Sequence, residues 1–135
     1  MGPVKVVAHY ADGRIVKGYT NNFLPDRPSF QVSSQPNSQE FVKIWIKDLK
    51  GLCFVRDFTG DAHYQEQKTF PEGMRPTGKA VEVTFMDGEI IVGSTEDHDL
   101  QRTGFFLVPA DPKSNNLRIF AVSQAVRKVR YIQPQ

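Results

Sequence analysis

Two short runs of the chain carry an apolar residue at every second position, and each run leads into an Asp-Gly pair. The apolar positions are Val4, Val6, Ala8 and Tyr10 in the first run and Val81, Val83 and Phe85 in the second. A period of two predicts half-buried β-strands. An Asp-Gly pair between such strands predicts a β-hairpin with a type I′ turn, here at Asp12-Gly13 and Asp87-Gly88.

The two runs belong to an internal repeat. Val6–Thr20 and Val81–Thr95 align without a gap at a constant offset of 75 positions. The same offset continues into the following loop, and the matched pairs include Asp12/Asp87, Gly18/Gly93, Arg27/Arg102 and Phe30/Phe105. Repeats of this kind indicate that one structural unit occurs twice. We therefore expect the chain to consist of two copies of one fold.

Each copy contains three further segments that predict strands. They are Ser29–Ser33, Phe41–Ile46 and Gly51–Val55 in the first copy, and Gly104–Val108, Leu117–Val122 and Val126–Ile132 in the second. The residues between the last two segments are enough for one 3₁₀ turn. Gly18 and Gly93 fall inside the second strand, where a missing side chain permits a sharp bend. This order predicts an all-β protein of two tandem five-stranded barrels of the SH3 type.

The predicted domains are residues 4–55 and residues 79–132, joined by a linker of residues 56–78. Glycine and proline residues punctuate the linker, which is typical of a connecting segment. Two interpretations of its middle part stay open: a short helix over Asp61–Lys68, with Asp61 as the N-cap, or an irregular tether. In the first interpretation, Tyr64 and Phe70 pin the helix onto a barrel.

The strand–Asp-Gly–strand–Gly opening and the aliphatic closing strand resemble the Sm-like barrel family. Over Gly104–Asn116 (GFFLVPADPKSNN), the chain is also similar to an uncharacterised bacterial domain of unknown function. The first resemblance implies an Sm-like fold and RNA binding. Sm proteins bind RNA through an Asp and an Asn before the third strand and an Arg-Gly pair near the closing strand. Here neither loop supplies the Asn, and Asp57 and Tyr131 follow the arginines, so those roles do not carry over.

The charge of the second copy is distributed unevenly, although the net charge of the chain is only +2. Residues 81–100 contain six acids and no base, whereas residues 112–135 contain five bases and no acid. A two-sided surface of this kind favours contact with another protein, or with the other copy, over a uniform phosphate-binding face.

The composition indicates a cytoplasmic protein. Cys53 is the only cysteine and lies in an apolar segment, so we expect a buried side chain rather than a reactive thiol. No apolar run reaches the roughly 18 residues of a membrane-spanning helix, and we expect no membrane insertion. The start has no signal-peptide pattern. Whether Gly2-Pro3 is native or an expression remnant stays open.

The chain contains no catalytic motif. It lacks a Gly-x-Ser-x-Gly nucleophile elbow and a glycine-rich phosphate loop. The segment Glu96-Asp97-His98-Asp99 gathers residue types that bind metals, but consecutive loop residues rarely converge on one ion, so a solvated acidic loop is the favoured interpretation. We therefore expect a non-enzymatic protein with no cofactor and no metal.

Four residues are candidates for protein contact. Phe23, Leu24 and Pro25 form an apolar loop that the second copy does not share, so the fold itself does not require them. Because polar residues flank Phe23 and Leu24, we expect these side chains to be exposed, and exposed apolar residues beside a proline often anchor protein contacts. Trp45 is the fourth candidate, and we expect it either buried between the copies or at an interface with a partner.

Four further residues are candidates for anion binding: Arg102, Lys113, Asn116 and Arg118. They lie in or near the loop Pro109–Arg118, whose Asp, Ser and Asn residues alternatively serve only to stabilise turns. The favoured function is a protein-interaction or adaptor module. The alternative is a sensor of an anionic ligand such as a nucleotide, or an Sm-like RNA-binding protein. The oligomeric state stays open.

Overall fold

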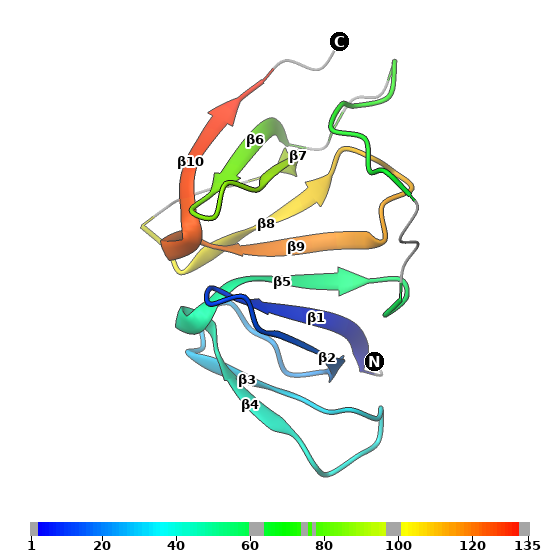
Figure 1. The fold of residues 1–135 in the computed structure, drawn as a ribbon, viewed down its shortest axis with the longest axis vertical. Coiled ribbons are helices and arrows are strands. Elements are labelled where there is room, and N and C mark those ends of the chain that lie inside the picture. Colours follow the sequence, from blue (N-terminus) through cyan, green and yellow to red (C-terminus); the bar gives the residue numbers. More distant parts are fainter. Residues whose placement is uncertain (1–2, 60–63, 74–75, 77, 97–100, 133–135) are drawn as a thin grey trace.

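The computed structural model describes residues 3–59, 64–73, 76, 78–96 and 101–132. Within these residues the protein is all-β, as predicted, and the same element order occurs twice (Figure 1). Copy 1 contains β1 (Val4–Tyr10), β2 (Ile15–Thr20), β3 (Ser29–Val32), β4 (Val42–Trp45), the 3₁₀ turn η1 (Ile46–Asp48) and β5 (Leu49–Val55). Copy 2 contains β6 (Lys79–Phe85), β7 (Ile90–Thr95), β8 (Gly104–Pro109), β9 (Asn116–Val122), the 3₁₀ turn η2 (Ser123–Ala125) and β10 (Val126–Tyr131).

Among the described residues the strands form no closed barrel, so the prediction is confirmed as an all-β fold but not as two tandem barrels. Eight strands form one sheet in the order β10-β6-β7-β8-β9-β5-β1-β2, and β3 and β4 form a separate pair. The reason lies in β5 and β9, which pair antiparallel with each other and lie side by side in the middle of the molecule (Figure 1). To close copy 2 into a barrel, β9 would have to pair with β10, but that edge of β9 pairs with β5 of copy 1.

The paired strands β5 and β9 are shared by two hydrophobic cores. Because side chains alternate along a strand, one face of the pair enters the core of copy 1 and the other face enters the core of copy 2. The first face carries Leu52, Phe54, Phe120 and Val122. The second face carries Cys53, Val55, Ile119 and Ala121. We call this β5–β9 pairing the seam, and it makes each core depend on a strand from the other copy.

The two Asp-Gly hairpins form as predicted, but their turns are not type I′. Gly13 and Gly88 have positive φ angles of 97° and 93°, whereas no described non-glycine residue has a positive φ. The Gly13 N–H donates to the Tyr10 carbonyl at 3.0 Å, as in a type I turn followed by a glycine bulge. Asp12 keeps its ordinary φ and accepts the Arg14 N–H at 3.0 Å through Oδ1.

Gly18 and Gly93 are needed because another strand passes close to them. A Cβ atom at Gly18 would lie 2.4 Å from the Ser33 carbonyl oxygen, and one at Gly93 would lie 2.2 Å from that of Val108. No side chain fits at such distances without moving the backbone. The third strand of each copy therefore approaches the second strand at its glycine.

The linker is irregular where the structure describes it. Residues 64–67 have no regular secondary structure, so the predicted helix does not extend over them, and 61–63 lie outside the described residues. The Lys68 ammonium donates to the Ile90 carbonyl at 2.6 Å, which attaches this part of the linker to copy 2. Within the described part of the chain, no helix has the length and apolar character needed to cross a membrane.

Candidate functional site

A groove with a volume of about 1010 Å³ lies where the two copies meet. Copy 2 contributes the end of β7, the loop before β8, and strands β8 and β9, while copy 1 contributes the loop after β2. The apolar lining residues are Pro25, Phe70, Pro76, Phe105, Phe106, Val108, Pro109 and Phe120, and the polar ones include Asp26, Ser94, Thr95, Glu96, Arg102 and Arg118. This size is at the upper end of the range found for ligand sites.

Alternation along β8 explains the apolar lining. Phe105 and Leu107 are buried in the core of copy 2, so Phe106 and Val108 occupy the opposite face of the strand. Phe106 packs against the core of copy 1. Val108 is 51% exposed, although it belongs to neither core. The exposed Val108 and the partly buried Phe106 together give the groove an apolar wall, in which Val108 serves neither core.

Arg118 supplies a well-positioned positive charge. Its guanidinium carbon lies 4.3 Å from the centre of the Phe54 ring and 4.4 Å from that of Phe106. The seam fixes this arrangement, because Phe54 and Arg118 are directly opposite each other in the β5–β9 register. Such stacking contributes about 0.5–1 kcal/mol at an exposed position. Among the residues that the structure describes, no carboxylate forms a salt bridge with Arg118, so its N–H groups can donate to a ligand.

Arg102 lines the same groove and a smaller cavity of about 380 Å³, which Lys47 and Ser123 also line. The structure thus brings two of the four predicted anion-binding residues, Arg102 and Arg118, to one groove. Glu96 and Asp26 line it as well, so the groove carries both signs of charge. It is not the uniformly basic surface that phosphate backbones require.

The predicted anion-binding residue Lys113 lies instead in a turn built around Asp111. The Asp111 carboxylate accepts the backbone N–H groups of Gln67 at 2.8 Å and Lys113 at 2.9 Å, and it also accepts the Tyr64 hydroxyl. These hydrogen bonds, that from Gln67 most strongly, hold the pKa of Asp111 below its ordinary value. The hydrogen bond to Asp111 raises the pKa of Tyr64 to about 12. Asp111 therefore attaches the linker to copy 2.

Asn116 also belongs to this attachment. Its backbone N–H donates to the Ser114 hydroxyl at 3.1 Å, and that hydroxyl donates to Glu66. Beside it, the Asn115 amide donates to the Asp57 carbonyl at 2.8 Å and accepts the Asp57 N–H at 3.1 Å. The polar residues of the 111–116 loop thus hold the linker in place, which favours the turn-stabilising interpretation of this loop over a recognition loop.

The loop that contains Phe23, Leu24 and Pro25 folds back over the seam. The Phe23 ring lies 5.0 Å from Phe30 and 5.1 Å from Phe120, centre to centre, so it joins the core instead of being exposed. This corrects the expectation of an exposed aromatic at this position. Leu24 is exposed, and Pro25 lines the groove. The three residues therefore do not form one contact surface.

Trp45 does not lie between the copies. It is 41% exposed on β4, and the Lys43 ammonium lies 4.4 Å from the centre of its ring. The side chains that β9 contributes to the core of copy 1 include Phe120 and Val122, whereas Trp45 is not part of that core. The expectation of burial between the copies is therefore wrong, and the interface interpretation stays a prediction.

The remaining candidates for chemistry are the thiol of Cys53 and the acidic residues that could bind a metal. Burial raises the pKa of the Cys53 thiol to about 12, so this buried side chain stays protonated at neutral pH. Asp97, His98 and Asp99 lie outside the described residues. Within the described ranges, no three His, Cys, Asp or Glu side chains come close enough together to hold a metal ion.

The internal repeat contains a sequence signal for the groove. At the offset of 75, Phe106 matches Gln31 and Val108 matches Ser33. An apolar residue that replaces a polar one at the outward position of the same strand indicates contact with something outside the unit. Phe106 meets the other copy, and Val108 lines the groove.

Comparison with curated proteins and with solved structures finds no match. A protein-family match covers residues 2–133, which includes both copies and the linker. This agrees with the similarity of Gly104–Asn116 to an uncharacterised domain. The chain therefore belongs to a family of unknown function, DUF6982.

Proposed function

We propose that this chain is a non-enzymatic protein-interaction module, and that its groove binds an extended, mainly apolar segment of a partner protein. The observation that carries the proposal is the wall formed by Phe106, Val108 and Arg118. Val108 is exposed without serving either core, and Arg118 is held by two aromatic rings while its N–H groups have no carboxylate partner among the described residues.

The chemistry of the groove defines the segment. Aromatic and aliphatic lining favours apolar side chains, and desolvated apolar contacts near the centre of an interface contribute most of the binding energy. Arg118 adds selectivity, because a planar guanidinium binds a carboxylate through two parallel hydrogen bonds. We therefore expect a segment with two or more apolar residues and one Asp, Glu or C-terminal carboxylate.

The experiment is a selection from a displayed peptide library on the full chain, followed by calorimetric titration of the selected peptides. Val108→Asp is expected to weaken binding at least tenfold, equivalent to about 1.4 kcal/mol. Met86→Asp is the matched control, because Met86 is an exposed apolar residue at the copy 2 hairpin, away from the groove lining. Equal binding by the wild type and by Val108→Asp would refute the assignment of the groove.

A second candidate function is the binding of an anionic ligand such as a nucleotide. It is favoured by one observation, namely that Arg102 and Arg118 both line a groove with aromatic side chains. A base can stack on an aromatic side chain while arginines bind its phosphate. Titration with a labelled oligonucleotide tests it, since such binding weakens steeply as salt rises. Salt-sensitive binding that Arg118→Glu abolishes would assign the groove to this ligand class instead.

We also propose that the five-stranded unit of each copy is related to the Sm-like barrels. It is supported by the repeated order of five strands, with a 3₁₀ turn before the last strand of each copy. We further propose that the protein is cytoplasmic and of bacterial origin.

A further inference from the structure

Strand β4 of copy 1 is the repeat equivalent of β9 of copy 2. Both follow the third strand and lead into the 3₁₀ turn. Ser29 faces Trp45 in the β3–β4 register, and its repeat equivalent Gly104 faces Val122 in the β8–β9 register. Trp45 therefore occupies the position of Val122. By the same register Lys43 occupies the position of Phe120.

These equivalent positions have opposite environments. Phe120 and Val122 are each 1% exposed, because β9 pairs with β5 and its outward face enters the core of copy 1. Strand β4 pairs only with β3 among the described strands, and it lies at the lower end of the molecule in Figure 1. On the outward face of β4, Trp45 is 41% exposed, and Phe41, just before the strand, is 52% exposed.

We propose that β4 is a docking edge for an extended segment of a different protein, which adds to it as an antiparallel strand in the way that β5 adds to β9. The shared fold of the copies shows what the fourth strand of this unit can accept. Apolar side chains along an open strand edge favour such addition. This site is separate from the groove and does not depend on its function.

A second copy of this chain is a poor occupant. The strand that it would offer is β10, the repeat equivalent of β5, but Lys128 and Arg130 stand there in place of Gly51 and Cys53. In the seam, a Cβ at Gly51 would lie only 3.0 Å from the Phe120 carbonyl oxygen. Lys128 would therefore crowd the equivalent position. Lys43 and Lys47 on the β4 side would also repel the bases of β10.

The seam specifies the strand that fits. Gly51 faces Ala121, whose equivalent on β4 is Ile44, so the segment needs a small residue there. Leu52 faces Phe120, whose equivalent is Lys43, and an acidic residue at that position pairs with the lysine. The next two positions face the equivalents of Ile119 and Arg118, which are Val42 and Phe41, and take apolar residues. The segment therefore has the pattern glycine, acid, apolar, apolar.

Trp45 is the only tryptophan of the chain, so its fluorescence reports on this edge. The probe is a peptide with the sequence of residues 49–55 that carries Leu52→Glu and Cys53→Val. A matched peptide carries Gly51→Lys as well. We expect a saturable blue shift of Trp45 emission with the first peptide, and an affinity lower by at least about tenfold for the second.

Two chain variants complete the test. Phe41→Ser is expected to abolish the shift, whereas Ile15→Ser, which changes a residue of similar exposure (54%) on β2, is expected to leave it unchanged. An unchanged Trp45 emission up to about 1 mM of the first peptide, the limit of weak binding, would overturn the proposal. Equal affinity for both peptides would also overturn it. A dimer of the wild type in sedimentation that Phe41→Ser dissociates would assign the edge to a second copy and would likewise contradict it.

Discussion

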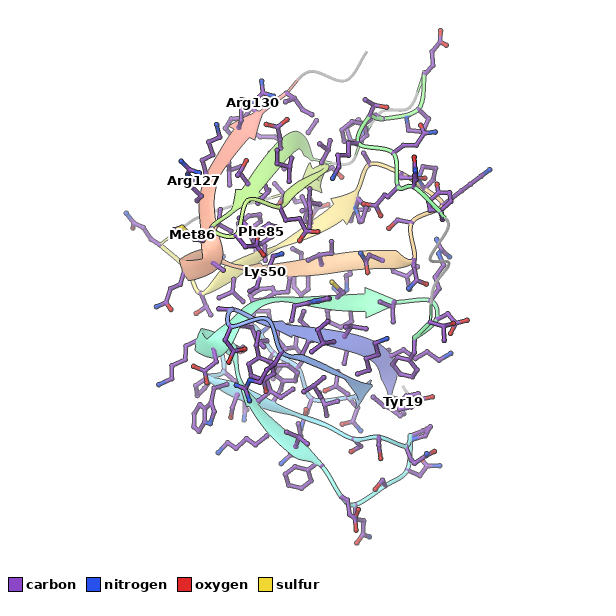
Figure 2. All side chains as sticks on the ribbon, viewed as in Figure 1. Tyr19, Lys50, Phe85, Met86, Arg127 and Arg130 are labelled. Carbon is purple, nitrogen blue, oxygen red and sulfur yellow. The ribbon has the colours of Figure 1, made fainter. Side chains whose placement is uncertain are left out.

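Strands β5 and β10 hold the same position in the two copies, yet one lies at the centre of the molecule and the other at its edge. The outward face of β5 carries Gly51 and Cys53 and enters the core of copy 2. The outward face of β10 carries Lys128 and Arg130, and Figure 2 shows Arg127 and Arg130 along the outer strand. Basic side chains on an edge strand prevent pairing with other strands. The difference shows how one repeated unit can pair with a second unit through β5, while the basic edge strand β10 disfavours the addition of a third.

The largest effect on stability is expected when a residue of β5 is replaced by its equivalent in β10. Gly51→Lys places an ammonium group in the seam, beside Ile119 and the Phe120 carbonyl. Burial of an unpaired charge costs about 3–5 kcal/mol, so we expect the free energy of unfolding to fall by that order. Chemical denaturation measures it. The reverse change at the edge, Lys128→Gly, should cost no more than about 1 kcal/mol, the penalty of glycine in a strand. Equal losses in both variants would refute the distinction between the two strands.

The next effect concerns the dependence of the copies on each other. Gly93→Val forces a side chain against the Val108 carbonyl, and overpacking of this kind costs about 3 kcal/mol. Because β5 and β9 serve both cores, the loss should appear as one cooperative transition that Trp45 of copy 1 also follows. Thermal unfolding monitored by Trp45 fluorescence and by far-ultraviolet circular dichroism tests this. If copy 1 kept the melting temperature of the wild type, the claim that the two copies share their cores would be refuted.

A smaller effect separates two neighbouring residues of one loop. Phe23 packs on the aromatic rings at the seam, so Phe23→Ser should lower the free energy of unfolding by about 2 kcal/mol. Leu24→Ser should change it by less than about 0.5 kcal/mol, because Leu24 is exposed. Urea denaturation of the two variants provides the comparison. A Phe23→Ser variant as stable as the wild type would place Phe23 outside the core.

The smallest effect concerns an ion pair between the copies. Lys50 of β5 binds Asp87 at 2.7 Å and also binds Glu89, and Figure 2 shows it beside Phe85 of copy 2. Hydrogen bonding to Lys50 lowers the pKa of Asp87, so the pair stabilises the fold above the ordinary aspartate pKa and is lost as the pH falls through the lowered value. Asp87 is largely exposed, and solvent screening limits the contribution to about 0.5 kcal/mol.

Lys50→Met should therefore lower stability more near neutral pH than near pH 2, because protonation of Asp87 removes the ion pair. Arg127→Met, the equivalent change on β10, should have no effect at either pH, because Arg127 forms no salt bridge within the described residues. Guanidinium titrations at the two pH values measure this. A loss in Lys50→Met of the same size at both pH values would show that the pair does not contribute.

Local structure could be predicted from the sequence because its signals are local. Alternation located the strands, and the repeat located equivalent hairpins in the two copies. The turn type was missed because Asp12 uses its carboxylate to accept the Arg14 N–H, which holds it at negative φ. The seam was missed because β5 and β9 are distant in the sequence, and their pairing depends on which strand edges the copies leave open. One difference between the copies does indicate this pairing: β5 has Gly51 and Cys53 at the positions where β10 has Lys128 and Arg130.

The groove itself was not predicted from the sequence, although two of the residues that line it were selected as candidates. Arg102 and Arg118 were selected for their charge, and both line it. Lys113 was selected for its charge and Asn116 as a hydrogen-bond donor, but their loop holds the linker. Phe23 was expected to be exposed because its neighbours in the sequence are polar, whereas its neighbours in space are aromatic. Whether such a residue lies in the groove, in a linker contact or in the core depends on which distant segments of the chain pack against it. The residue type alone does not show this.

The most direct test of the proposed function is an amide NMR titration of the full chain with a peptide selected on it. Binding in the groove predicts that the amide signals of Phe106, Val108 and Arg118 shift together and saturate at one dissociation constant. The signals of the Asp12-Gly13 hairpin, away from the groove, should stay in place. Shifts confined to the 111–116 loop or to Leu24, with the β8 signals unchanged, would contradict the account.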